Sequence, residues 1–304
     1  MEYILKTNCL EKRYHDFTAL NGLTMSVPKG SIYGFVGKNG AGKTTLIRLI
    51  CGLQHADGGD FELYGEKNTS RAIFAARRRM GAVIETPSIY LDMTAEDNLK
   101  QQYDVLGVPA YEGMDDLLKL VGLSDTGKKK AKNFSLGMRQ RLGIAVALCG
   151  DPDFLVLDEP INGLDPQGII EIRELILKLN RERKITVLIS SHILDELSRL
   201  ATHYGFIDHG RIVREMSAAE LEKVCRKCIR LTVTDVKALA MVLDDMGMEY
   251  KITDDQNADV YAKPVLSEIV RKLDPYGCEL ITASERDESL EGYYISLVGG
   301  GSHE

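Results

Sequence analysis

The sequence lacks the long apolar segment that a membrane-spanning helix requires. No stretch of the 304-residue chain approaches the roughly 18 uncharged apolar residues expected of such a helix. The first ten residues include Glu2, Lys6 and Asn8, which is not the composition of a signal peptide. An excess of positive charge is also missing, because the net charge is −7. We therefore expect no direct membrane span, and the charge argues against nucleic acid as the main partner.

A second cysteine pair, which a zinc site would need, is absent as well. Cys225 and Cys228 have C-x-x-C spacing, but no second pair or suitably placed histidine accompanies them. The six scattered cysteines are typical of reduced thiols in the cytoplasm. The hydrophobic content of 44% is sufficient for a real core, and the length allows one large or two modest domains.

What the sequence does contain is a phosphate-binding loop. Residues 37–45 fit G-x-x-x-x-G-K-[ST] and lie between an expected strand at 31–36 and an expected helix ending at Gly52. Glycines let backbone amides approach phosphates closely, and a helix N-terminus adds partial positive charge. Lys43 can reach the β- and γ-phosphates, and the Thr44 hydroxyl can ligate Mg²⁺. The predicted nucleotide-binding residues of this loop are Gly37, Asn39, Gly40, Ala41, Gly42, Lys43, Thr44 and Thr45.

Two acids close a second buried strand. Residues 154–157 form an apolar run, which is typical of a parallel strand buried on both faces, and Asp158 and Glu159 follow it. Ligands of open α/β sheets bind at the carboxyl ends of such strands. We predict that Asp158 holds Mg²⁺, directly or through water, and that Glu159 accepts a proton from an attacking water.

A third segment resembles the signature of ATP-binding cassette (ABC) ATPases. Residues 134–141 read F-S-L-G-M-R-Q-R, and the family form is L-S-G-G-Q followed by R-Q-R. Ser135 and Gly137 match, whereas positions 134, 136 and 138 depart. This version is similar to cassettes of bacitracin-resistance and lantibiotic-immunity exporters. The apolar residues after it recur with helical spacing, so Ser135 falls near a helix N-terminus, where a hydroxyl and free amides make a second anion site.

Three further positions resemble the family in order and spacing. Asp165 lies in a segment, 162–166, that resembles the D-loop, and His192 closes an apolar strand at 185–191 and resembles the switch histidine. Tyr14 resembles the aromatic on which adenine stacks, although Phe17 is nearby. The resemblance covers roughly residues 1–215. It implies that Lys43, Glu159 and His192 are catalytic.

The resemblance also implies a fold and partners. We expect an α/β P-loop NTPase fold of the ABC type over 1–215, with a helical subdomain at about 90–150. The implied cofactors are ATP and Mg²⁺. In this family, Ser135, Gly137 and Asp165 would contact a nucleotide held by another cassette. The resemblance therefore implies a cassette dimer, either a homodimer or a pair with a related cassette. A separate transmembrane permease is implied too, with this chain cytoplasmic at the inner face of the cell membrane.

One position departs from most cassettes. In most cassettes of this family, an arginine-rich helix is followed by a strand that ends with glutamine. In this chain the corresponding strand is formed by the apolar residues 81–84, and Glu85 follows it. A carboxylate is a stronger ligand for a hard cation than an amide, and it adds negative charge near the γ-phosphate. Lantibiotic-immunity cassettes resemble this chain in having glutamate there. We predict that Glu85 is a metal neighbour beside the groove for the transmembrane partner; the alternative is a solvated acid.

Residues 216–304 lie beyond the family motifs. Alternating strand and helix patterns predict a small C-terminal α+β accessory domain, resembling a ferredoxin-like fold, with a role in dimer support or regulation. The whole chain is thus expected to be the ATPase subunit of an ABC exporter of an antimicrobial peptide or similar amphipathic compound. One alternative is a soluble ABC ATPase in repair or translation, but the long coiled coil or second cassette of that class is missing. The other is a nucleotide-binding module without turnover, which retention of the catalytic residues disfavours.

Overall fold

The computed structural model describes residues 2–108, 111–225, 228–261, 265–286 and 290–299. The chain divides into two compact units, Met1–Ala218 and Ala219–Glu304. Within the described ranges, no helix combines the length and the apolarity that crossing a membrane needs. The motifs predict that the first unit ends at residue 215. Its last strand continues to Ser217, so the unit extends slightly beyond that residue.

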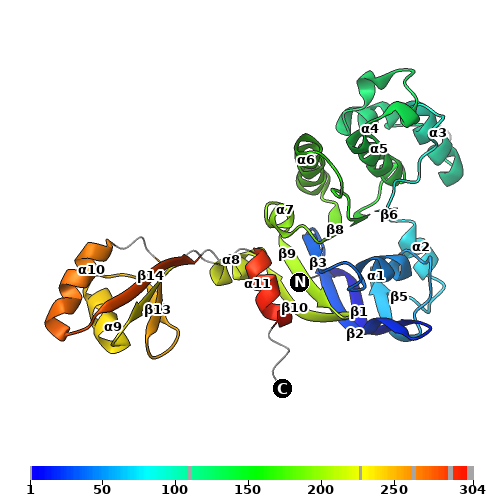
Figure 1. The fold of residues 1–304 in the computed structure, drawn as a ribbon. Helices are drawn as coiled ribbons and strands as arrows, with labels where there is room; N and C mark the ends of the chain where they lie inside the picture. The colour runs from blue at the N-terminus through cyan, green and yellow to red at the C-terminus, as the bar shows by residue number, and fades with distance from the viewer. Residues whose placement is uncertain (1, 109–110, 226–227, 262–264, 287–289, 300–304) are drawn as a thin grey trace. The chain divides into compact units, whose positions relative to one another are not determined.

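A six-stranded sheet forms the centre of the first unit (Figure 1). Its strands are β3 (Ile32–Val36), β6 (Met80–Val83), β7 (Phe154–Asp158), β8 (Thr186–Ser191), β9 (His203–Asp208) and β10 (Arg211–Ser217). They lie in the order β10-β9-β3-β8-β7-β6, and all neighbours are parallel except β9 and β10. β3, β7 and β8 are buried along their whole length, as parallel strands covered on both faces must be. The carboxyl ends of five strands therefore share one edge.

A second, antiparallel sheet and one helix complete this part of the core. The strands are β1 (Tyr3–Tyr14), β2 (Phe17–Pro28), β4 (Gly58–Leu63) and β5 (Glu66–Lys67), and the helix is α1 (Lys43–Ile50). Leu46, Ile47 and Ile50 of α1 pack in one apolar cluster with Phe35 of the six-stranded sheet and Phe61 of the antiparallel sheet. This packing fixes the start of α1 at the shared edge of the six-stranded sheet.

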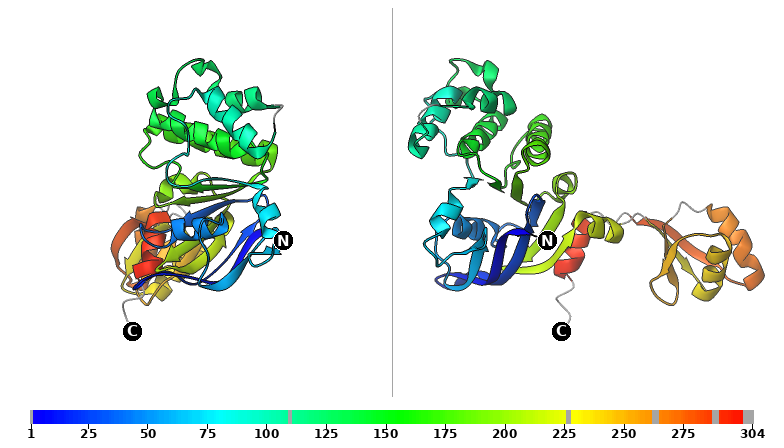
Figure 2. Two further views of the ribbon diagram at one scale, coloured as in Figure 1. Left: turned by 90° about the vertical axis from the view of Figure 1, so that its right-hand side faces the viewer. Right: turned by 180° about the vertical axis from the view of Figure 1, so that it is seen from behind.

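The other α-helices described in the first unit follow α1 along the chain. They are α2 (Ile73–Arg77), α3 (Ala95–Leu106), α4 (Met114–Leu120), α5 (Leu136–Leu148), α6 (Pro166–Arg183) and α7 (Leu194–Ser198). α3, α4 and α5 pack against one another and form a helical part that projects away from the two sheets (Figures 1 and 2). α3 begins with a capping box, in which Thr94 and Asp97 satisfy each other's backbone N–H groups.

The second unit is a small antiparallel sheet with helices. Its elements are α8 (Ala218–Val224), β11 (Cys228–Val233), α9 (Val236–Asp245), β12 (Tyr250–Ile252), β13 (Asn257–Val260), α10 (Leu266–Leu273), β14 (Leu280–Arg286) and α11 (Leu290–Gly299). The sheet order is β12-β13-β11-β14, and α9 and α10 share its apolar core. From β11 to β14 the chain order is β-α-β-β-α-β, which is the order of ferredoxin-like folds. β12, with three residues, was not among the elements expected from the sequence.

Candidate nucleotide-binding site

The phosphate-binding loop runs from β3 into α1 and depends on its glycines. Gly42 has a φ of 112°, and a Cβ there would lie 2.5 Å from the carbonyl oxygen of Ala19. Gly40 has a φ of 82°, but a Cβ there would meet open space. The loop is therefore packed tightly on one side and free on the other. α1 begins at Lys43, directly after these glycines, so its N-terminal amides lie next to the loop, as a phosphate site requires.

Lys43 is folded into its own loop. Its side chain is only 5% exposed, and Nζ donates to the carbonyl oxygens of Gly37, at 2.5 Å, and Lys38, at 3.2 Å. Nζ also lies 3.1 Å from Oε1 of Glu159, although this contact lacks the alignment of a hydrogen bond. The ammonium group thus has three oxygen neighbours, and phosphate oxygens would have to replace at least the carboxylate.

Asp158, the last residue of β7, is almost completely buried. Oδ1 accepts a hydrogen bond of 2.5 Å from the hydroxyl of Ser190, the residue opposite it on β8. Oδ2 has no hydrogen-bond partner among the described residues. A buried carboxylate oxygen without a donor is costly to leave unsatisfied, and a hard cation is the ligand that suits it. The residues present therefore fit a divalent cation bound here with the nucleotide.

Glu159 follows Asp158 with a left-handed backbone, at a φ of 50°. Its N–H donates to the Ser190 hydroxyl at 3.0 Å, and its Oε2 lies 2.8 Å from Nδ1 of His192. The structure thus brings the three expected catalytic residues together in the order Lys43, Glu159, His192. Ser190 holds both acids in place and was not singled out from the sequence, because only the pairing of β7 with β8 shows which serine of the run faces them.

The structure places Tyr14 and Glu85 in separate surroundings. The Tyr14 hydroxyl donates to Oε1 of Gln54, and Lys12 Nζ lies 5.6 Å from the centre of the tyrosine ring. The carboxylate of Glu85 pairs with Arg48 of α1 at 2.6 Å. Among the described residues, no three His, Cys, Asp or Glu side chains form a ready metal cluster. Adenine stacking by Tyr14 and metal contact by Glu85 therefore stay predictions.

The signature and D-loop residues form a second group. Ser135 is the N-cap of α5, and its hydroxyl accepts a hydrogen bond of 3.2 Å from the N–H of Met138. Asp165 is the N-cap of α6, and its carboxylate accepts a hydrogen bond of 3.1 Å from the N–H of Gly168. A Cβ on Gly137 would lie 3.7 Å from Cα of Gly168, so the two helix starts are close neighbours. Ser135 and Asp165 are both exposed. Both helix starts are therefore accessible to solvent.

Comparison with known proteins identifies the family. The family model described as ABC transporter matches residues 20–162. The bacitracin transport ATP-binding protein BcrA of Bacillus licheniformis is 39% identical over 308 residues, which cover 99% of this chain and 99% of BcrA. The chain belongs to the ABC transporter family. The lantibiotic transport ATP-binding protein SrtF of Streptococcus pyogenes is 43% identical over 212 residues, which cover 70% of this ABC protein and 90% of SrtF.

Solved structures confirm the fold of this ABC protein. The ADP conformation of MJ1267, an ATP-binding cassette of an ABC transporter, matches with a TM-score of 0.66 and 28% identity over 74% of this chain and 95% of MJ1267. The α/β P-loop cassette expected from the sequence is therefore confirmed. The activity of this ABC protein is the binding and hydrolysis of ATP that powers transport.

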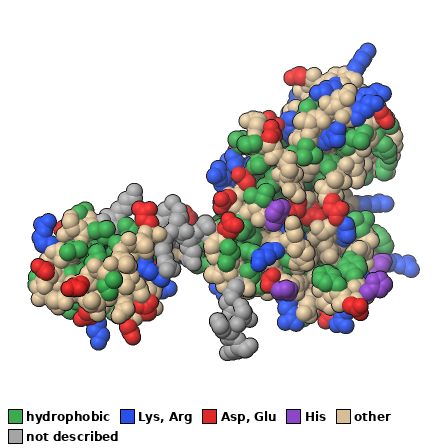
Figure 3. Space-filling model, viewed as in Figure 1, with side chains coloured by type: hydrophobic (Ala, Val, Ile, Leu, Met, Phe, Trp, Pro, Cys, Tyr) green, Lys and Arg blue, Asp and Glu red, His purple; other side chains and the backbone are tan. Residues whose placement is uncertain are grey.

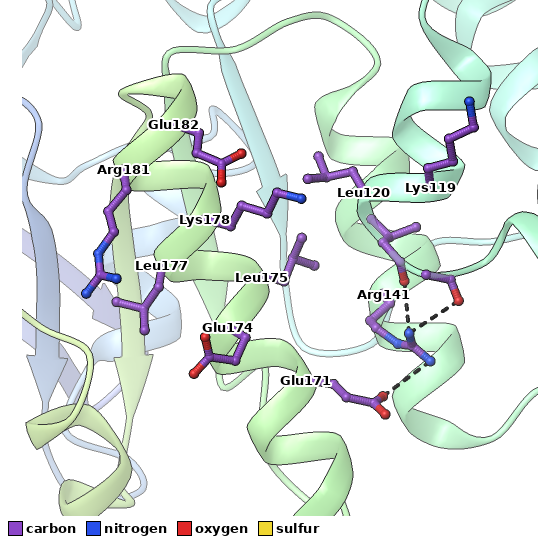
Figure 4. A pocket seen from close by; sticks show the side chains of 12 residues that line it. Lys119, Leu120, Arg141, Glu171, Glu174, Leu175, Leu177, Lys178, Arg181 and Glu182 are labelled. Carbon is purple, nitrogen blue, oxygen red and sulfur yellow. Dashed lines mark hydrogen bonds and ion pairs between the residues drawn. The ribbon is translucent and has the colours of Figure 1, made fainter.

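A cavity elsewhere in the ABC protein is not the nucleotide site. It has a volume of about 470 Å³ and lies between the end of α4, α5 and α6 (Figure 4). Arg141 of α5 donates to the carbonyl of Val121 at 2.9 Å and pairs with Glu171 of α6 at 3.3 Å, so it ties the helical part to α6. None of the residues of the phosphate loop lines this cavity.

The surface of the first unit carries both signs of charge (Figure 3). In the space-filling view, acidic side chains and a histidine gather where the helical part meets the sheets, while basic side chains are frequent on the helical part (Figure 3). This distribution agrees with a site in which carboxylates are concentrated at one sheet edge and are balanced by nearby cations.

Proposed function

We propose that this ABC protein powers the export of an antimicrobial peptide or a similar amphipathic compound. The observation that carries the proposal is the end-to-end relation with the bacitracin transport protein BcrA, which includes the C-terminal unit. The relation with the lantibiotic transport protein SrtF supports the same substrate class. In the proposal, residues 1–215 form the cassette, with its helical subdomain at about 90–150, and residues 216–304 form an accessory domain.

The proposed chemistry assigns each buried polar group a task. Lys43 and the loop residues Gly37, Asn39, Gly40, Ala41, Gly42, Thr44 and Thr45 would hold the triphosphate of ATP. Asp158, Thr44 and Glu85 would hold Mg²⁺. When bound, this ion would neutralise phosphate charge and polarise the transferred group. Glu159 would accept the proton of the attacking water through Oε1, the oxygen released when Lys43 turns to the phosphates. His192 would hold Oε2, and Tyr14 would stack on adenine.

The exposed helix starts support a cassette dimer. Ser135 and Asp165 are the exposed N-caps of α5 and α6, and Gly137 lies in the first turn of α5. In the proposal they bind the nucleotide held by the facing cassette. Two half-sites would then make each catalytic site, and hydrolysis would let the pair reopen.

A permease subunit is the second proposed partner. A cavity of about 460 Å³ lies beside the edge strand β6 and is lined by Phe74, Arg77 and Ile84, next to Glu85. An apolar and basic groove of this kind supports docking of a helix from a membrane subunit. The protein would accordingly be cytoplasmic and held at the inner face of the cell membrane by this contact.

The two alternative functions have less support. No observation favours a soluble ABC ATPase of repair or translation. BcrA and SrtF, whose names both refer to transport, match most of the chain. A module without turnover is disfavoured because Lys43, Glu159 and His192 are joined in one contact network beside Asp158.

A pair of cell experiments tests the export proposal. Tagged protein is purified from detergent-solubilised membranes of its host, and the deletion strain is tested for growth in bacitracin and in a lantibiotic. We expect an integral membrane subunit to co-purify, and sensitivity to rise and to be restored by the wild-type gene but not by Glu159→Gln. A protein recovered without any membrane partner, together with unchanged sensitivity to both peptides, would contradict the proposal.

A further inference from the structure

Each of two glutamates at neighbouring strand ends has its own cation from α1. Glu159 follows β7 and contacts Lys43 at 3.1 Å, and Glu85 follows β6 and contacts Arg48 at 2.6 Å. Lys43 is the first residue of α1, and Arg48 lies five residues later. Arg48 has no part in the mechanism described above.

The sheet explains why the two glutamates come together. β6 and β7 are parallel and paired as far as Val83 opposite Leu157, and Glu85 and Glu159 each stand two residues beyond this last pair. Both glutamates leave their strands with a left-handed backbone, at φ values of 57° and 50°. Such values are uncommon for residues other than glycine and often mark functional sites. The backbone therefore carries both carboxylates to the same edge, where the phosphate loop also ends.

The position of Arg48 on α1 sets how far Glu85 is from the phosphates. Arg48 follows Thr44 by four residues, so the two side chains lie on the same helix face, about 6 Å apart along the axis. Glu85 contacts the end of the Arg48 side chain, so its carboxylate lies beside the helix face that carries the hydroxyl proposed as a metal ligand. A carboxylate at this distance without a cation beside it would repel a triphosphate. The Arg48–Glu85 pair has no net charge. In this respect the pair resembles a glutamine at position 85.

We propose that Arg48 is a positioning residue that makes glutamate acceptable at position 85. It cancels the charge of Glu85 when the nucleotide binds, until a metal ion competes for the carboxylate. The inference rests on the proposed role of the phosphate loop. For unit charges this far apart, in a medium between protein and water, the Coulomb energy corresponds to about a fivefold change in nucleotide affinity.

The test compares four full-length proteins: wild type, Arg48→Gln, Glu85→Gln and the double variant. The dissociation constant of a fluorescent ATP analogue is measured in low salt with excess EDTA, so that neither metal nor hydrolysis contributes. We expect Arg48→Gln to bind about fivefold more weakly, Glu85→Gln to bind like the wild type, and the double variant to recover to within about twofold. The loss should shrink in high salt, because both side chains are partly exposed.

A control pair lies at the other end of the same strands. Arg79 precedes β6, Asp153 precedes β7, and the two form an exposed ion pair. Arg79→Gln should therefore leave nucleotide affinity unchanged. Arg48→Lys serves as a second variant that keeps the charge if Arg48→Gln does not fold, and it should bind nucleotide like the wild type.

Three outcomes would overturn the inference. Equal affinities of all four proteins would show that the pair does not affect the nucleotide. A double variant as weak as Arg48→Gln would show that Arg48 attracts the phosphates directly. An Arg48→Lys protein as weak as Arg48→Gln would show that charge is not the cause. Failure of the proposed nucleotide site is distinguishable from all three, because wild type itself would then not bind the analogue.

A magnesium titration of the same proteins adds a second readout. Binding of the ATP analogue is followed as Mg²⁺ is added. Glu85→Gln should need more Mg²⁺ for half-maximal binding than the wild type, because a carboxylate ligand is lost. Arg48→Gln should need less, because Glu85 is then free of its competing cation. Superimposable titrations would contradict the proposed competition between Arg48 and the metal for Glu85.

Discussion

Replacing Glu159 with glutamine tests two consequences of one side chain. Its two carboxylate oxygens lie 3.1 Å from Nζ of Lys43 and 2.8 Å from Nδ1 of His192. Glutamine keeps the size of the side chain but removes its charge and its ability to accept a proton. Loss of a general base typically costs about 10²–10⁴-fold in rate. We expect ATP hydrolysis by Glu159→Gln to fall within that range.

The second consequence concerns Lys43 before nucleotide arrives. The side chains of Lys43 and Glu159 are 5% and 17% exposed, so water screens their contact little. Lys43 keeps the carbonyls of Gly37 and Lys38 in the variant, so the loss is that of one Coulomb contact between unit charges, about 1–4 kcal/mol. The same contact must break before Lys43 can turn to the phosphates. Recovering about 1.4 kcal/mol of that energy would lower the dissociation constant of ATP about tenfold.

Three measurements and one control decide the matter. Phosphate release gives the rate, a fluorescent analogue gives the affinity, and thermal melting without nucleotide gives the stability. The control is Glu196→Gln, because Glu196 pairs with Arg173 at 3.0 Å with similar burial but away from the phosphate loop. It should lower the melting temperature and change neither rate nor affinity. Near-normal hydrolysis by Glu159→Gln would refute its role as base, and an unchanged affinity would refute the competition for Lys43.

Three further predictions address other parts of the chain. Ser135→Arg should leave the affinity for ATP nearly intact but block ATP-driven dimerisation, and a light-scattering signal equal to that of wild type would contradict this. A chain ending after Ala218 should fold and bind ATP. A chain ending four residues earlier should melt at a lower temperature, because it loses Glu215, which accepts a hydrogen bond of 2.5 Å from the buried Tyr33 hydroxyl. Equal melting temperatures of the two chains would refute this. Burial raises the pKa of the Cys149 thiol to about 12. A thiol reagent at pH 8 should therefore leave Cys149 unmodified but react with the exposed Cys9. Rapid modification of Cys149 would argue against its burial.

The sequence was sufficient where the chemistry is carried by neighbours along the chain. The phosphate loop and the Asp158–Glu159 pair are local patterns, and the fold class and the family expected from them are confirmed by the comparisons. Contacts between distant residues could not be predicted in this way. Ser190 is 32 residues from Asp158, and Arg48 is 37 residues from Glu85. Only the pairing of strands and the packing of α1 bring these residues together.

The second unit shows a different limit. Its longer helices and strands follow from apolar periodicity, because α9 buries Leu239 and Leu243 on one face. β12 has only three residues, two of which are exposed, so it has no alternating pattern to recognise. Its place at the sheet edge depends on pairing with β13, from Tyr250 opposite Val260 to Ile252 opposite Ala258.

The charges at the sheet edge have a consequence for nucleotide binding. Two cations, Lys43 and Arg48, contact the carboxylates of Glu159 and Glu85, and Asp158 adds a third carboxylate whose Oδ2 has no hydrogen-bond partner among the described residues. Two positive and three negative groups leave this cluster with one net negative charge before any phosphate arrives. A triphosphate brings several more negative charges to the same place. The glycine loop supplies only partial charges, so we infer that a divalent cation entering with the nucleotide strengthens its binding. Asp158, which lacks a cation of its own, is the group that this ion would satisfy.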